Sequence, residues 1–147
     1  TEEVEAAIPD YILNPDMDMP VKAVEGQEYI GILEIPALAL ELPVISEWSY
    51  PKLKKAPCRY SGTAYRNNLI IMAHNYRSHF GMLKELSQDD IIVFTDVDGN
   101  TFSYKVMAIE VLLPEQVEEM TSGEWDFTLF TCTIGGKSRI VVRCESV

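Results

Sequence analysis

The strongest constraint on the fold is a series of short strand-like runs, each bounded by residues that interrupt strands. Proline, glycine and polar clusters separate these runs, as is typical of short β-strands in a mostly-β protein. The runs are rich in β-branched and large apolar residues and lie at 29–35, 40–45, 69–73, 91–95, 101–111, 127–131 and 140–143. About seven or eight strands with little helix predict an all-β sandwich or barrel.

Two of the runs indicate how their strands are buried. Residues 69–73 (Leu-Ile-Ile-Met-Ala) are continuously apolar, which predicts a strand buried on both faces. In 101–106, Phe102, Tyr104 and Val106 alternate with polar residues, the period of a strand with one buried face. The Asp98-Gly99 pair before that run predicts a hairpin turn.

Only short helices are expected. Residues 49–55 predict one short helix, and the helical spacing of Phe80, Leu83 and Leu86 predicts a turn or two of another. Residues 1–28 predict a partly irregular N-terminal lead-in, because Pro9, Pro15 and Pro20 interrupt it. Residues 29–147 are then the main domain.

The charge of the chain excludes several classes of partner. Asp and Glu total 23, Lys and Arg total 12, and the formal net charge is −11. Nucleic acid is therefore not expected as a partner, because phosphate binding depends on Lys and Arg. Electrostatic docking on anionic lipid is disfavoured for the same reason. No apolar run reaches the roughly 18 residues needed to span a bilayer.

Three residues could carry acyl-transfer chemistry. Cys132 ends one predicted strand and precedes the Gly135-Gly136 loop, Arg139 begins the next strand, and His74 ends the most apolar strand. A thiolate can attack a carbonyl, an imidazole can move protons, and a guanidinium can stabilise an oxyanion. The residue types alone are weak support, since free cysteine is often only a small core residue.

The sequence segments around these residues resemble those of a known family. Thr-Leu-Phe-Thr-Cys at 128–132, followed by Arg139, is similar to the TLxTC…Arg signature of the sortases, cysteine transpeptidases of mainly Gram-positive bacterial surfaces. Four further stretches resemble the family's first strands, the segment before its histidine strand and that strand itself: 29–36, 42–44, 60–64 and 69–74. Where many members have Gly-His, this chain has Ala73-His74. The resemblance covers about residues 29–145.

The resemblance implies a closed eight-stranded β-barrel with one or two short helices, in which 29–147 is the catalytic domain. It also implies cleavage of an LPxTG-like sorting signal of surface proteins between Thr and Gly. Cys132 would form a thioacyl enzyme, His74 would act as acid or base, and Arg139 would bind substrate carbonyls and the oxyanion. Thr131 would lie beside the oxyanion region.

The implied partners and location follow from the same resemblance. The acceptor would be an amine, from a peptidoglycan precursor or a pilin lysine, and water would give hydrolysis instead. The enzyme would work on the outer face of the cell membrane, held there by an anchor absent from this chain. The subclass stays open among B, C and D.

Several alternatives remain at this stage. Arg143 competes with Arg139 for the arginine role, and Arg139 is preferred because it directly precedes the apolar run. A catalytically idle barrel that binds cell-wall or surface protein is the rival function. An L,D-transpeptidase is disfavoured, because its short motif joining His and Cys is missing. No metal or cofactor is expected; calcium bound through Glu115, Glu118, Glu119 and Glu124 is the less favoured alternative.

Minor features have simpler interpretations. The 96–100 segment partly resembles a calcium loop but is better explained as a hairpin turn. The glutamates of 115–124 are better explained as a solvated acidic face. Cys58 and Cys144 are expected to be separate thiols rather than a disulfide, and His79 an exposed loop residue.

Overall fold

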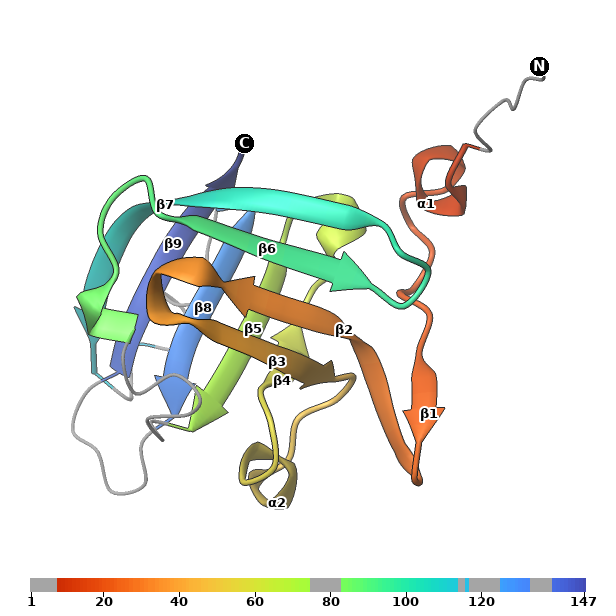
Figure 1. The fold of residues 1–147 in the computed structure, drawn as a ribbon, viewed down its shortest axis with the longest axis horizontal. Helices are drawn as coiled ribbons and strands as arrows, with labels where there is room; N and C mark the ends of the chain where they lie inside the picture. The colour runs from red at the N-terminus through yellow and green to blue at the C-terminus, as the bar shows by residue number, and fades with distance from the viewer. Residues whose placement is uncertain (1–7, 75–82, 114–115, 117–124, 133–138) are drawn as a thin grey trace.

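The computed structural model describes residues 8–74, 83–113, 116, 125–132 and 139–147, and at Cys132 it describes the backbone. Strands dominate this part of the chain (Figure 1). The nine strands are β1 (Lys22–Val24), β2 (Gln27–Ile35), β3 (Leu40–Ile45), β4 (Cys58–Ser61), β5 (Leu69–His74), β6 (Ile91–Asp96), β7 (Thr101–Leu112), β8 (Phe127–Cys132) and β9 (Arg139–Ser146).

Eight of these strands form a closed barrel. The strand order is β1-β2-β3-β4-β5-β8-β9-β7-β6, and a further antiparallel pairing of β2 with β6 closes the sheet. β1 pairs with the first residues of β2 and extends the sheet outside the closed ring. The predicted closed eight-stranded, mostly-β barrel is therefore confirmed, and closure leaves few strand edges exposed.

Helices in the described residues are short. They are α1 (Asp10–Leu13), α2 (Tyr50–Leu53) and the 3₁₀ turns η1 (Pro36–Leu38), η2 (Ala64–Arg66) and η3 (Leu83–Glu85). The predicted helix at 49–55 is α2, whose first turn is capped by the Ser49 side chain accepting from the Lys52 amide at 3.2 Å. The predicted turn at 80–86 is seen as η3, while its first residues lie outside the described part. None of the helices described has the length and hydropathy needed to span a bilayer.

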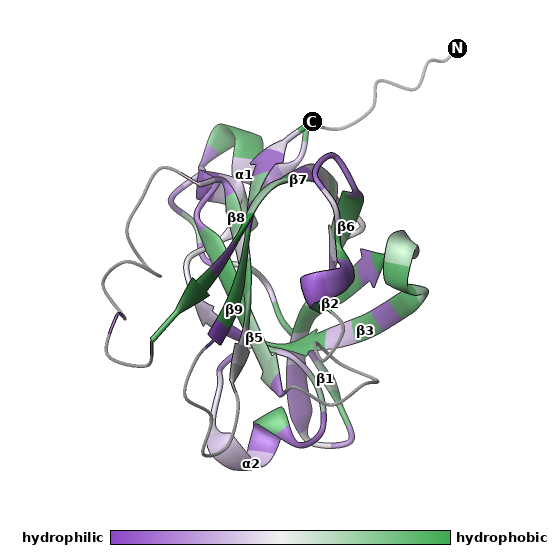
Figure 2. Cartoon of the chain, turned by 90° about the vertical axis from the view of Figure 1, so that its left-hand side faces the viewer, coloured by the Kyte–Doolittle hydropathy of each residue, from purple (hydrophilic) through white to green (hydrophobic). Residues whose placement is uncertain are grey.

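The barrel wall separates two apolar clusters. The larger one fills the barrel and includes Leu69, Ile71 and Ala73 of β5. A smaller cluster on the outer face includes Ile70 and Met72 of the same strand, together with residues of β8, β9 and α2. All six residues of β5 are buried, as the apolar run predicted. Figure 2 accordingly shows β5, β8 and β9 in largely hydrophobic colours.

The Asp98-Gly99 turn joins β6 to β7, and Gly99 has a φ of +90°, as a tight hairpin requires. Buried Asp96 organises this turn, because its carboxylate accepts from the amides of Asp98 and Asn100 at 3.0 and 2.8 Å. The Tyr65 hydroxyl donates to the same carboxylate at 2.6 Å. The hairpin interpretation of this segment is therefore confirmed.

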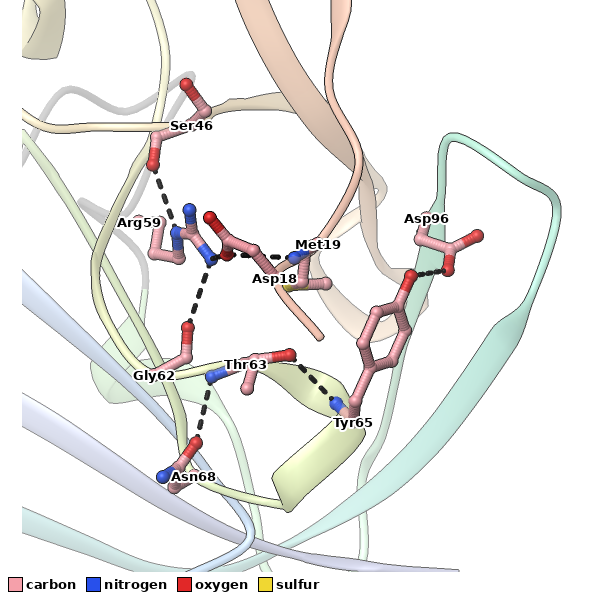
Figure 3. Close-up of polar contacts among 9 residues, drawn as sticks. All are labelled: Asp18, Met19, Ser46, Arg59, Gly62, Thr63, Tyr65, Asn68 and Asp96. Atoms are coloured by element: carbon pink, nitrogen blue, oxygen red, sulfur yellow. Dashed lines mark hydrogen bonds and ion pairs between the residues drawn. The ribbon is translucent and has the colours of Figure 1, made fainter. Parts of the chain in front are cut away.

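The lead-in packs against the barrel instead of standing apart from it. Tyr11 stacks on Tyr65 with ring centroids 4.6 Å apart. Arg59 of β4 bonds the Asp18 carboxylate at 3.3 Å and the carbonyls of Ser46 and Gly62 at 3.0 and 3.3 Å (Figure 3). The strand predicted from Tyr29 begins at Gln27.

Gly31 and Gly26 disfavour a larger side chain for two different reasons, lack of space and backbone conformation. At Gly31 a methyl group would collide with the Thr95 carbonyl oxygen and lie 2.8 Å from the Phe94 ring, so space at the β2–β6 closure is limiting. At Gly26 there is open space, but φ is +84°. We expect Gly31→Ala to lower the free energy of unfolding by about 3 kcal/mol through overpacking. Gly26→Ala should cost about 1 kcal/mol through backbone strain alone.

Chemical denaturation of the two variants beside the parent chain measures both costs. Equal losses at the two positions would contradict the assignment of Gly31 to barrel closure.

Candidate active site

The candidate site is built on the pairing of β5 with β8. These strands are parallel and in register over their whole length, from Leu69 opposite Phe127 to His74 opposite Cys132. Neighbouring strands lie about 4.8 Å apart, and paired positions belong to the same face of a sheet. The backbone therefore brings positions 74 and 132 together at one end of the barrel wall.

Arg139 enters from the other side of β8. β9 runs antiparallel to β8, with Phe130 opposite Val141, and this register carried two residues further sets Arg139 opposite Cys132. The Ile140 amide donates to the Thr131 hydroxyl at 3.1 Å, which joins the start of β9 to the end of β8. Three adjacent strands thus bring the three predicted site positions to the same level.

The outer apolar cluster forms the floor beneath these positions. Phe130 and Met72 lie two residues before Cys132 and His74 on their strands, and both are buried. The Arg139 guanidinium carbon lies 5.9 Å from the centre of the Phe130 ring, a cation–π contact. Arg139 Nε is buried and has no hydrogen-bond partner among the described residues. His74 is also buried, at 5% exposure.

Arg143, the competing arginine, is used within the fold. Its side chain is 3% exposed, and its Nε donates to Glu110 Oε1 at 3.1 Å. Its Nη1 donates to the Thr128 hydroxyl at 3.3 Å. These contacts tie β9 to β7 and β8 and favour Arg139 for the role in chemistry.

Thr131 makes a structural contact in this state. It is 3% exposed, and its hydroxyl accepts the Ile140 amide hydrogen described above. Along β8 it alternates with Cys132, so its position belongs to the opposite face of the sheet. Its role beside an oxyanion stays a prediction.

Several predicted features lie outside the described residues. These are His79, the Gly135-Gly136 loop and the glutamates at 115, 118, 119 and 124. Within the described part of the chain, no group of three or more His, Cys, Asp or Glu residues could hold a metal ion.

The sequence reasoning missed a row of aromatic rings beside the site. Tyr60 of β4 meets Phe130 edge to face at 5.3 Å, and Trp48 stacks on Tyr60 at 5.9 Å. The rings come from three separate segments, so no local pattern could have shown that they meet.

Cys58 and Cys144 are separate free thiols, as expected. Cys144 lies inside the barrel and Cys58 in the outer cluster. Burial raises the pKa of the Cys58 thiol to about 11 and that of Cys144 to about 12. Both stay protonated at neutral pH and are poor nucleophiles there.

We therefore expect iodoacetamide at pH 8 to label one thiol of the folded chain, Cys132. Labelling of the other two should rise only as the pH approaches their raised pKa values or when the chain is unfolded, because thiolate is the reactive form. Peptide mapping by mass spectrometry gives the site of each label. Rapid labelling of Cys58 or Cys144 at pH 8 would contradict this assignment.

Comparisons of this chain with known proteins point to one family. Residues 33–147 match the family model described as "Sortase domain". No curated protein matches the chain. Sortase A from Corynebacterium diphtheriae superposes with a TM-score of 0.70 at 26% identity, covering 82% of this chain and 61% of that protein.

Two solved sortases C are similar to the chain to the same degree. The enzyme from Clostridium perfringens SM101 gives a TM-score of 0.68 at 26% identity over 97% of this chain and 77% of its own. Sortase C1 from Streptococcus suis gives 0.68 at 25% identity over 81% and 73%. The chain thus spans about three fifths of the sortase A chain and about three quarters of these two. Because the family model matches most of the chain, this protein belongs to the sortase family, a family of cysteine transpeptidases.

Proposed function

We propose that this chain is an active sortase that cleaves an LPxTG-like sorting signal and transfers the surface protein to an amine. The observation that carries the proposal is the shared level of His74, Cys132 and Arg139 on three neighbouring strands. A barrel without activity would not require a histidine, a cysteine and an arginine at this one place.

In the first half of the proposed reaction, the Cys132 thiolate attacks the threonine carbonyl carbon of the signal. A C–S bond forms and the oxygen becomes an oxyanion, which the Arg139 guanidinium stabilises. When the oxyanion collapses, the Thr–Gly C–N bond breaks, and the departing amine takes its proton from the His74 imidazolium. A thioacyl enzyme and a released C-terminal fragment result.

The second half reverses these roles. The acceptor amine attacks the thioester carbonyl and gives a proton to neutral His74. A C–N bond forms, the C–S bond breaks, and Cys132 returns as thiolate. Water in place of the amine gives hydrolysis.

The Nε of Arg139, which has no hydrogen-bond partner among the described residues, supports its part in this scheme. A buried donor without a partner costs free energy, and an incoming carbonyl or oxyanion would supply the missing acceptor. Arginine also stays charged throughout the reaction and offers several donors in a fixed plane.

The proposed partners are surface proteins with a C-terminal sorting signal and an amine acceptor from a peptidoglycan precursor or a pilin. The proposed location is the outer face of the cell membrane. Membership of a family of cell-surface enzymes supports both.

Cleavage assays on variants of two of the three cysteines test the proposed nucleophile. We expect Cys132→Ala to abolish release of the C-terminal fragment from LPxTG-like peptides, because no thioester can form. Cys58→Ala, a matched control in the outer cluster, should cleave at the parent rate. Chromatography of the peptide products gives both rates. Activity retained by Cys132→Ala would refute the mechanism, and no cleavage of any peptide by the parent chain would favour the idle barrel.

Replacement of Arg139 should mainly affect the cleavage rate, whereas replacement of Arg143 should mainly affect stability. Arg139→Ala should reduce cleavage about 100-fold or more through loss of oxyanion stabilisation. Its free energy of unfolding should change by about 1 kcal/mol or less, the scale of the lost cation–π contact with Phe130. Arg143→Ala should lower stability by about 2 kcal/mol, since it leaves Thr128 and Glu110 without their charged partner. Cleavage rates and denaturation curves of both variants check this, and an exchange of the two patterns would reassign the catalytic arginine.

A further inference from the structure

A row of aromatic side chains leads from the candidate site to the protein surface. It continues from Arg139 over Phe130 to Tyr60, Trp48 and Tyr50. Trp48 and Tyr50 meet edge to face at 5.4 Å, and they are 37% and 66% exposed. We call Trp48, Tyr50 and Tyr60 the aromatic ledge. Exposed apolar side chains that lie in contact with one another mark interaction sites more often than isolated ones do.

The base of the aromatic ledge is fixed by the fold. Ser46 begins the loop that carries Trp48, and its amide donates to the Glu28 carbonyl at 3.0 Å. The Arg59 Nε donates to the Ser46 carbonyl at 3.0 Å, as Figure 3 shows. Tyr50 begins α2, whose Leu53 is buried in the same outer cluster as Phe130. The ledge is therefore a preformed surface that would lose little conformational entropy on binding.

The aromatic ledge is also locally basic in an acidic protein. Residues 46–60 contain four basic residues and one acidic residue, although the net charge of the chain is −11. Arg59 forms an ion pair with Asp18. Lys52, Lys54 and Lys55 form no ion pair with any other described residue. Lys54 and Lys55 are exposed. Broad rings beside lysine ammonium groups suit a ligand with flat apolar faces and negative charge.

We propose that the aromatic ledge and Lys52, Lys54 and Lys55 bind the amine acceptor, and that this acceptor is an anionic glycopeptide. The inference rests on the proposed transpeptidase function and deepens it. Sugar rings would lie on Trp48 and Tyr50, and carboxylate or phosphate groups would meet the lysines. The acceptor amine would then extend past Tyr60 toward Cys132, over the buried Phe130. In Figure 1, α2 lies at the end of the barrel to which β5 and β8 point.

Charge decides between the two acceptor classes. A lysine of a protein acceptor is a cation and would approach past three ammonium groups that form no ion pair with another described residue. A peptidoglycan precursor is anionic apart from its free amine, so the same groups would attract it. The aromatic ledge therefore favours the precursor over a pilin lysine.

Binding can be tested without catalysis. We would titrate Cys132→Ala protein with a soluble disaccharide–pentapeptide of peptidoglycan and follow backbone amides by NMR. Shifts should concentrate at 46–55 and Tyr60, and Trp48→Ala or the pair Lys54→Gln and Lys55→Gln should weaken binding about tenfold. Matched controls are Ile109→Ala and Lys105→Gln, which lie on β7, four strands away from β4 in the closed ring, and should bind as the parent does. Absence of shifts at the ledge, or their appearance with a lysine-bearing peptide alone, would overturn the proposal.

Kinetics separate this inference from the proposed function. In the ledge variants the acceptor concentration for half-maximal transfer should rise about tenfold. Thioacyl formation, hydrolysis and transfer to the small neutral nucleophile hydroxylamine should be unchanged. If thioacyl enzyme forms but the variants use the glycopeptide as well as the parent does, the acceptor site is wrong and the proposed function stands. If no thioacyl enzyme forms while the NMR shifts occur, the proposed function fails and the binding surface stands.

Discussion

The parallel pairing of β5 with β8 is the constraint on which the candidate site depends. It joins segments far apart in the sequence, and its register alone sets His74 opposite Cys132. A slip of one residue would move one of the two positions to the other face of the sheet. Burial of every residue of β5 opposes such a slip, because Leu69, Ile71 and Ala73 would then leave the barrel core.

The inner and outer faces of the sheet formed by β5, β8 and β9 have different roles. Inside the barrel, apolar residues of β5, β8 and β9 supply most of the packing that holds the strands in place. Outside, the same strands carry a smaller apolar cluster, the candidate site and the paired Arg143. Stability therefore comes mainly from one face, while the other can present a histidine, a cysteine and an arginine with Phe130 beneath them.

The fold was largely predictable because its signals are local. Apolar runs ended by breakers indicated the strands, the Asp98-Gly99 pair indicated the hairpin, and the unbroken run at 69–73 indicated the doubly buried strand. The site residues were predicted through a family resemblance, since spacing alone cannot show which strands pair. The role of Arg143 and the row from Phe130 to Trp48 were beyond prediction, because each depends on side chains that meet only after the barrel closes.

The most direct test of the account is the intact mass of the protein after incubation with a panel of LPxTG-like peptides varied at the first and third positions. The account predicts an acyl adduct with the mass of the peptide up to threonine, mapped to Cys132 and released by an added amine. An adduct on Cys58 or Cys144, or a Cys132 thiol that resists even a small alkylating reagent, would contradict it.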